Sequence, residues 1–371
     1  FIFSATGSNE LARHAAWFDF TAVRQSLAYV FGLGIVAAMC FVDYSRLARW
    51  SLPAYWASIA LLLCVYLFGV ERLGAKRWID FGPIQFQPSE FAKLAFLFAL
   101  ANFLSRPVGE LASRALFVKA LAMALLPFAL ILKQPDLGSA LVFLPMALVM
   151  MLVAGVPQRL LFRFLVAAGL LVSVVLVDVL FAPPAWRFAR LEEYQRHRLL
   201  VYFGLDFAPA GASDAERVAA RAEQEKKSYN VKQALISVGS GGLVGKGWRQ
   251  GTQGALGYLP RAVAHNDFIF SVIAEETGFF GSVLVLSLYA VVLFSGIKIA
   301  GQARDRLGRI LAAGVVTLLF THVFVNIGMN IRLMPVTGIP LPLLSAGGTS
   351  VVCSLVAIGI LQNIHQNRRH Y

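Results

Sequence analysis

Long runs of apolar residues recur along almost the whole chain, and this pattern limits the fold more than any other feature. Nine runs of helical length follow one another, at residues 25–42, 53–70, 89–104, 116–133, 139–156, 162–181, 268–297, 310–329 and 350–364. Each is long enough, or nearly so, to cross a bilayer as a helix. The chain is 58% hydrophobic and only 14% charged, which soluble domains are not. With a stump at residues 1–5, the sequence predicts an all-α polytopic integral membrane protein of ten transmembrane helices, the first one truncated.

Basic residues gather in the connections on one side of this predicted bundle. The connections at 43–52, 105–119, 157–163 and 298–309, together with the tail at 365–371, hold 13 Lys or Arg and 3 Asp or Glu. Because loops rich in Lys and Arg stay in the cytoplasm, we expect that side and both termini to be cytoplasmic. These loops supply +10 (13 minus 3) of the net charge of +13. The basic excess therefore indicates topology beside an anionic leaflet, and no nucleic-acid partner.

One connection on the opposite side is much longer than the others. Residues 182–267, between predicted helices seven and eight, form an 86-residue loop with 12 Lys or Arg and 8 Asp or Glu. Ser213-Asp-Ala-Glu216 is a capping box that should begin a helix. Long structureless loops are uncommon, so we expect a large outer loop carrying amphipathic helices on the bilayer. Pro335, Pro340 and Pro342 predict that 332–342 is a tightly turned loop in protein-lined space.

Charged side chains at the ends of apolar runs are costly in hydrocarbon and so indicate function. Glu90 and Lys93 are three residues apart and can pair on one helix face. They form either a structural ion pair or part of a polar cavity. Asp136 follows a helix-breaking Lys133-Gln-Pro, where it either caps the next helix or lines the same cavity. The sequence leaves both alternatives open in each case.

Asp267 is the strongest candidate for a catalytic group. It follows a glycine-rich loop and stands just before the apolar run that begins at Phe268, at the outer mouth of a predicted span. A partly hydrated carboxylate there suits a general base near neutral pH. The alternative is that Asp267 is the N-cap of the following helix. Glu275 and Glu276 are adjacent, so at most one of them should face a shared cavity.

Two common classes of site do not fit the sequence. The stretch 239–247 is rich in glycine but lacks the spacing of a phosphate-binding P-loop. The six histidines form no ligand motif. A divalent cation, Mg or Mn, would therefore have to be held jointly with the phosphates of a substrate.

Several longer motifs resemble those of the SEDS family. They are Gly74-Ala-Lys-Arg-Trp-Ile, Gln87-Pro-Ser-Glu-Phe-Ala-Lys93, Lys133-Gln-Pro-Asp-Leu-Gly, Gly245 to Gln253, His265-Asn-Asp-Phe-Ile-Phe, Asn326-Ile-Gly-Met and Pro335-Val-Thr-Gly-Ile-Pro-Leu-Pro. The similarity extends over essentially the whole chain and is closer to the rod-shape branch, RodA, than to the division branch. It implies a single SEDS transmembrane domain over 1–371 that polymerises lipid II as a peptidoglycan glycosyltransferase. It also implies a bacterial inner-membrane location, the elongation machinery and a class B penicillin-binding protein as transpeptidase partner.

The resemblance also implies roles for particular residues. The essential aspartate of the family falls on Asp267. Its polar cavity residues fall on Glu90, Lys93 and Asp136. The matching motifs add Gln253 and His265 as substrate-binding or cavity residues. The sequence departs from the family pattern at Arg261, Arg332 and Ala346, which changes the shape and charge expected of the pocket.

The reaction that this resemblance implies defines what the site must supply. Lipid II carries its sugar on an α-linked diphosphate, and the polymer is β-1,4 linked, so one in-line displacement with inversion fits. It needs a base for the acceptor hydroxyl, assigned to Asp267, and positive charge for the leaving diphosphate. The candidates for that charge are Arg77, Lys93, Lys246 and Arg332, or a divalent cation.

Two other functions fit the same topology. Ten spans with buried charges also describe a lipid II flippase, although the candidate groups lie mostly at the outer end and no inverted repeat is clear. A catalytically silent scaffold that only positions a penicillin-binding protein is the third interpretation.

Overall fold

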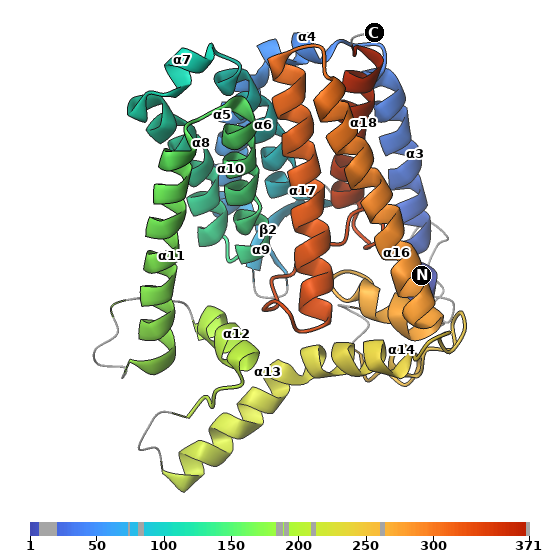
Figure 1. The fold of residues 1–371 in the computed structure, drawn as a ribbon. Coiled ribbons are helices and arrows are strands. Elements are labelled where there is room, and N and C mark those ends of the chain that lie inside the picture. Colours follow the sequence, from blue (N-terminus) through green and yellow to red (C-terminus); the bar gives the residue numbers. More distant parts are fainter. Residues whose placement is uncertain are drawn as a thin grey trace.

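A bundle of mostly long helices stands on a layer of helices from the long connection (Figure 1). The computed structural model describes residues 1–6, 21–72, 75–80, 85–182, 188, 193–208, 213–259 and 264–368. The bundle consists of α3 (Thr21–Met39), α5 (Ser51–Phe68), α6 (Pro88–Leu104), α8 (Arg114–Lys133), α9 (Leu137–Leu141), α10 (Phe143–Ala154), α11 (Gln158–Phe181), α16 (Ile269–Gln302), α17 (Arg306–Asn330) and α18 (Gly348–Gln366). Eight helical stretches within the described residues are long and apolar enough to cross a membrane, with α9 and α10 counted as one.

The nine full apolar runs each coincide with a stretch of this bundle. The run at 89–104 becomes α6, which at 17 residues is slightly shorter than the eight membrane-length stretches. The run at 139–156 is divided between α9 and α10 at Val142. Residues 2–6 form the short helix α1 (Ile2–Thr6). The chain is therefore a polytopic membrane protein, as predicted, whereas the count of ten spans stays a prediction.

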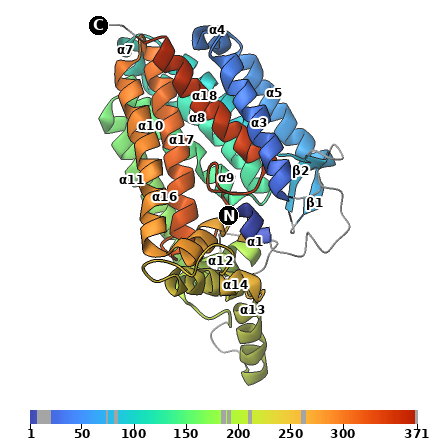
Figure 2. The same cartoon turned by 90° about the vertical axis from the view of Figure 1, so that its right-hand side faces the viewer.

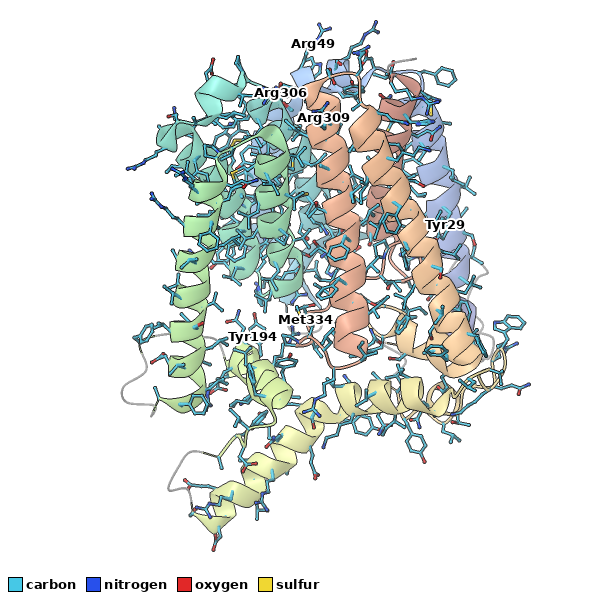
Figure 3. The ribbon with its side chains drawn as sticks, in the orientation of Figure 1. Tyr29, Arg49, Tyr194, Arg306, Arg309 and Met334 are labelled. Carbon is cyan, nitrogen blue, oxygen red and sulfur yellow. The ribbon has the colours of Figure 1, made fainter. Side chains whose placement is uncertain are left out.

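The connections that the charge pattern grouped together lie at one end of the bundle. α4 (Tyr44–Arg49), α7 (Val108–Leu111) and the C-terminus are at the top of Figure 1. Figure 3 shows Arg49, Arg306 and Arg309 at that end, and Tyr194 and Met334 at the other. We call the other end the loop-rich end. Residue 1 lies toward the loop-rich end in Figure 1, so a cytoplasmic location of both termini stays a prediction.

The long connection forms a layer of helices across the loop-rich end. α12 (Glu193–Phe203), α13 (Asp214–Ser240) and α14 (Thr252–Ala255) make up this layer, and the first half of α13 extends beyond the bundle (Figures 1 and 2). The predicted capping box is present, because the Ser213 hydroxyl accepts from the Glu216 amide and the Glu216 carboxylate accepts from the Ser213 amide. Gln224 of α13 donates to the carbonyl of Leu205 at 3.1 Å, which ties α13 to the end of α12.

A small antiparallel sheet packs against α5 and α6 and was not predicted. Its strands are β1 (Val70–Arg72), β2 (Ala75–Asp80) and β3 (Gln85–Phe86), in the order β1-β2-β3. Strands of two to six residues are too short to produce a clear alternating pattern. The sheet matters here because β2 carries Arg77 to the loop-rich end of the bundle.

Helix α17 forms the centre of the bundle, and α11 lies at its edge. The most apolar window of α17 is 78% buried, whereas that of α11 is 11% buried. Apolar side chains such as Leu170, Leu171 and Phe181 of α11 are exposed, as expected for a helix surrounded by lipid. Polar groups that must be held rigidly are therefore best placed on α17.

The glycine-rich stretch after α13 forms a close backbone joint with α16. α16 is broken at Gly278, whose φ of 68° is non-helical. The amides of Phe279 and Phe280 donate to carbonyls of the stretch, at 2.9 and 3.1 Å, so the groups freed by the break are satisfied. A Cβ on Gly245 would lie 2.2 Å from the carbonyl oxygen of Glu276. The glycines therefore allow two backbones to touch.

We expect Gly245→Ala to lower the free energy of unfolding by about 2 kcal/mol or more, because the new methyl group meets backbone and Gly245 has a positive φ of 81°. Thermal unfolding in detergent measures this. Gly239→Ala is the matched control, since a Cβ there has no atom within 4 Å. Equal melting temperatures for the two variants would contradict the close backbone contact between the glycine-rich stretch and α16.

Candidate active site

Asp267 lies in the turn that leads into α16, and its main chain is fixed by α17. Its carbonyl oxygen accepts hydrogen bonds from the side-chain amides of Asn326, at 3.0 Å, and Asn330, at 3.1 Å. α16 begins at Ile269 with Phe268 as its N-cap. The interpretation of Asp267 as that N-cap is therefore wrong, since the observed helix starts one residue later than the sequence suggested. The Asp267 carboxyl group is therefore not used to cap α16.

Asn326 and Asn330 form a buried amide pair that the sequence analysis missed. They are one helical turn apart, share a face of α17, and are both 0% exposed. Asn326 also donates to the carbonyl of Ile339 at 2.7 Å, and Asn330 accepts from the Ser271 hydroxyl at 2.5 Å. Two amides four residues apart in an otherwise apolar run were the available signal, because such groups must be paired where they are buried.

The segment 335–342 forms a wall beside Asp267. It is irregular, and Thr337, Ile339 and Leu341 within it are each 1% exposed, which confirms the predicted turned loop in protein-lined space. Gly338 lies against the Asp267 carboxyl, because a Cβ on Gly338 would be 3.5 Å from Oδ2. The φ of 78° at Gly338 favours glycine. The segment thus passes close to Asp267 with no side chain between them.

Arg77 and Asp136 meet at the same end of the bundle. The Arg77 guanidinium lies 3.7 Å from Asp136 Oδ1 and donates to the carbonyl of Pro135. Asp136 accepts from the Ser139 amide at 3.1 Å, so it caps α9. It also accepts from Gln87 at 3.3 Å. The capping interpretation is confirmed, and the same carboxylate also holds an arginine.

Arg198 of α12 is a further cation at this site and was not predicted. It donates to the carbonyl of Val336 at 3.1 Å, and its guanidinium stands over the Tyr194 ring at 5.6 Å. Burial lowers its pKa, the positive charge of Arg77 lowers it further, and the negative charges of Asp267 and Asp136 raise it. The outer loop contains many arginines, and nothing in the sequence distinguishes Arg198 among them.

Burial raises the pKa of Asp267 to about 6. Arg198 and Arg77 oppose this rise, and the like charge of Asp136 supports it. Asp267 is therefore mostly protonated below about pH 6 and ionised above it. At neutral pH it is a carboxylate whose conjugate acid is weaker than an ordinary aspartic acid, which favours proton acceptance.

Glu90 and Lys93 form the predicted ion pair, deep in the bundle. Lys93 Nζ lies 2.7 Å from Glu90 Oε1, and the two side chains are 1% and 4% exposed. Nζ is also 2.9 Å from Nε2 of His322 on α17, a residue that the sequence analysis missed. A small cavity lined by these three residues together with Pro342 and Cys353 adjoins the pair. The interpretation as a structural ion pair is confirmed. The adjoining cavity is lined mainly by apolar side chains, and a role of the pair in contacting substrate stays a prediction.

Other candidates hold the outer layer in place. Lys246 pairs with Glu275 at 2.7 Å, and the backbone amide of Gln253 donates to the same carboxylate at 3.1 Å. The His265 carbonyl accepts from the amide of Ala346 at 2.8 Å. Arg332 donates to the carbonyl of Val201 at 3.3 Å, near the end of α12. Substrate contact by Lys246, Gln253, His265 and Arg332 stays a prediction, and Arg261 lies outside the described residues.

Glu275 and Glu276 point to different partners, as adjacent helical residues must. Glu275 faces Lys246 and Thr252 of the outer layer. Glu276 accepts from the Arg249 amide at 3.2 Å and from the Ser4 hydroxyl. Both carboxylates therefore attach surrounding segments to the first turns of α16.

The part of the chain that the structure describes contains no group of three His, Cys, Asp or Glu able to hold a metal ion. Asp136 and Asp267 are the acidic groups nearest the two arginines. A divalent cation here would need oxygen ligands from a bound substrate.

Comparison with known proteins gives consistent matches. The model of the FtsW/RodA/SpoVE family, described as "Cell cycle protein", matches residues 1–370. The peptidoglycan glycosyltransferase MrdB of Escherichia coli is 37% identical over 91% of this chain and 84% of its own length. The peptidoglycan glycosyltransferase RodA of Treponema pallidum is 32% identical over 92% of this chain and 89% of its own length.

Two solved structures resemble the fold. A structure described as "Structural coordination of polymerization and crosslinking by a peptidoglycan synthase complex" superposes with a TM-score of 0.75 at 30% identity, covering 100% of this chain and 97% of that chain. The crystal structure of the rod shape determining protein RodA of Thermus thermophilus gives a TM-score of 0.63 at 30% identity, covering 94% and 88%.

Proposed function

This chain belongs to the FtsW/RodA/SpoVE family of cell cycle proteins, and from that premise we infer that it is a peptidoglycan glycosyltransferase of the RodA type. Relatives with that activity in their names are 32 and 37% identical over more than nine-tenths of the chain. We propose that its substrate is lipid II and that it builds glycan strands for cell elongation. The observation that carries the chemical proposal is Asp267, a partly buried carboxylate with a pKa of about 6 that experiences the positive charges of Arg198 and Arg77 and lies against Gly338.

Asp267 acts as the general base. The acceptor sugar must lose the proton of its 4-hydroxyl as that oxygen attacks the anomeric carbon of the donor. A carboxylate with a raised pKa takes this proton in the transition state and still ionises below neutral pH. The side-chain amides of Asn326 and Asn330 hold the main chain of Asp267, and Gly338 lies against its carboxyl. This restraint favours a near-attack geometry.

Arg198 and Arg77 receive the leaving diphosphate. Breaking the anomeric bond transfers an electron pair to the diphosphate oxygen, which leaves without needing a proton. The departing group carries about two negative charges, and guanidinium groups bind such oxygens through two parallel hydrogen bonds. The nearby carboxylate of Asp136 keeps Arg77 oriented before substrate binds. Attack and departure on opposite faces of the sugar give the inversion that an α-linked donor and a β-linked product require.

The loop-rich end faces outward in this proposal. The basic connections at the opposite end suit the cytoplasm, so the chain would span the bacterial inner membrane ten times, with the C-terminus inside. The reacting groups then lie near the outer leaflet, where lipid II presents its sugars. The apolar, exposed surface of α11 suits contact with lipid.

A class B penicillin-binding protein is the proposed partner. The solved complex with the higher TM-score is described as coordinating polymerization and crosslinking, and a polymerase needs a separate transpeptidase for the second of these reactions. A lipid II flippase remains the alternative function. In detergent there are no two membrane sides, so polymer formed there can come only from an enzyme.

The test is polymerisation of purified lipid II in detergent with the partner present. We expect Asp267→Asn to reduce the rate by about 100-fold or more, because a general base contributes about that much or more. Asp214→Asn is the matched control, since Asp214 is an exposed aspartate of the same outer loop. A near-parental rate for Asp267→Asn would remove the assignment, and no polymer from the parental protein would remove the function. An arm with EDTA tests the divalent cation.

Replacement of Arg198 tests the diphosphate site. We expect Arg198→Met to lower kcat/KM for lipid II by about 10- to 100-fold, the loss typical of a charged hydrogen bond, with Arg198→Lys intermediate. The acid limb of the pH profile should move to higher pH, because Arg198 lowers the pKa of Asp267. Arg217→Met, at an exposed position of α13, is the control. An unchanged kcat/KM together with an unmoved limb would contradict this role.

A further inference from the structure

His322 is a buried, titratable group in the centre of the bundle that the proposed reaction does not use. It stands in the middle of α17 and is 5% exposed. Its Nε2 lies 2.9 Å from Lys93 Nζ, and its Nδ1 lies 3.3 Å from the carbonyl oxygen of Pro340. One ring therefore touches both the Glu90–Lys93 pair and the segment that forms the wall beside Asp267.

The donors and acceptors around the ring determine its tautomer. The lysine ammonium carries three hydrogens and no acceptor, so Nε2 must accept from Lys93. Nδ1 then carries the ring hydrogen and donates to the carbonyl of Pro340. A chain of directed bonds results, from Lys93 to Glu90 on one side and from Lys93 through His322 to Pro340 on the other.

The segment that receives this bond is stiff and short. Pro340 and Pro342 have fixed φ angles, and Gly338, two residues before Pro340, lies against the Asp267 carboxyl. The side-chain amide of Asn326 donates to the carbonyl of the intervening Ile339 and to the carbonyl of Asp267. A shift at Pro340 would therefore be transmitted to both sides of the base.

We propose that His322 is a positioning residue, which couples the Glu90–Lys93 pair to the wall of residues 335–342 beside Asp267. This inference rests on the proposed glycosyltransferase function and adds to it. His322 touches no reacting atom. Its bonds fix where the Pro340 carbonyl stands, and thereby how closely Gly338 covers the carboxyl of Asp267. The buried ion pair then serves the reaction by anchoring that chain of bonds.

The test compares variants of His322 in the lipid II polymerisation assay in detergent. Leucine at this position removes both ring bonds, and glutamine keeps an oxygen for Lys93 and an amide donor for Pro340. Thr321→Val is the matched control, because Thr321 is a buried neighbour whose hydroxyl donates to the Thr317 carbonyl of its own helix. Each variant is checked for a parental elution volume and melting curve. The rate is measured across pH.

We expect His322→Leu to lower kcat by about 10- to 100-fold, the loss typical of a small misplacement of reacting groups, with little change in KM. The acid limb of its pH profile should move to lower pH, because a looser wall lets water reach Asp267. His322→Gln should recover most of the rate, and Thr321→Val should behave as the parental enzyme. A mere loss of folded protein would lower the plateau without moving the limb.

Two results would overturn the proposal. One is a folded His322→Leu variant with parental kcat and pH profile. The other is an equal loss in the glutamine and leucine variants, which would assign His322 to packing alone. If the leucine variant does not fold, His322→Asn replaces it, since the shorter side chain cannot hold both partners and the same loss is expected. Inactive parental protein would instead count against the proposed function.

Discussion

Carbonyl groups inside an apolar bundle need hydrogen-bond donors, and six carbonyls of segment 333–343 have theirs in side chains of four helices. An irregular backbone at such a depth is stable only where protein satisfies it. The donor and acceptor pairs are Tyr202 to Leu333, Arg198 to Val336, Asn326 to Ile339, His322 to Pro340, Tyr289 to Pro342 and Tyr29 to Leu343. The segment is thereby fixed between α3, α12, α16 and α17, and the site is built against it.

This constraint explains why the catalytic assignment depends on residues far apart in the chain. Asp267 comes from the turn before α16, Arg77 from β2, and Arg198 from α12. Asp267 and Arg198 both contact the fixed segment, because Arg198 donates to the Val336 carbonyl and Gly338 lies against the Asp267 carboxyl. Arg77 is held separately, by Asp136 and the Pro135 carbonyl. Partial burial at this wall also raises the pKa of Asp267 to about 6. Geometry and basicity of the proposed base thus have the same physical origin.

The sequence predicted the parts of the structure that have a strong local signal. The apolar runs, the capping box at Ser213, the cap at Asp136 and the Glu90–Lys93 pair all depend on spacing along one helix or turn. The sheet around Arg77 escaped prediction because its strands are short. Arg198 and His322 escaped because their roles come from contacts with Val336 and Pro340, more than a hundred residues and eighteen residues away. Such contacts follow from tertiary packing, which one sequence does not reveal.

The central claim is that Asp267 is a base whose burial tunes it to act near neutral pH. The most direct measurement is the infrared difference spectrum between the parental protein and Asp267→Asn, followed across pH in the absence of substrate. The part of that difference that changes with pH should be the carboxyl band of Asp267, because the amide of the asparagine does not titrate. The account predicts that the band titrates with a midpoint of about 6. A midpoint near 3.8, the ordinary value for aspartate, would contradict it.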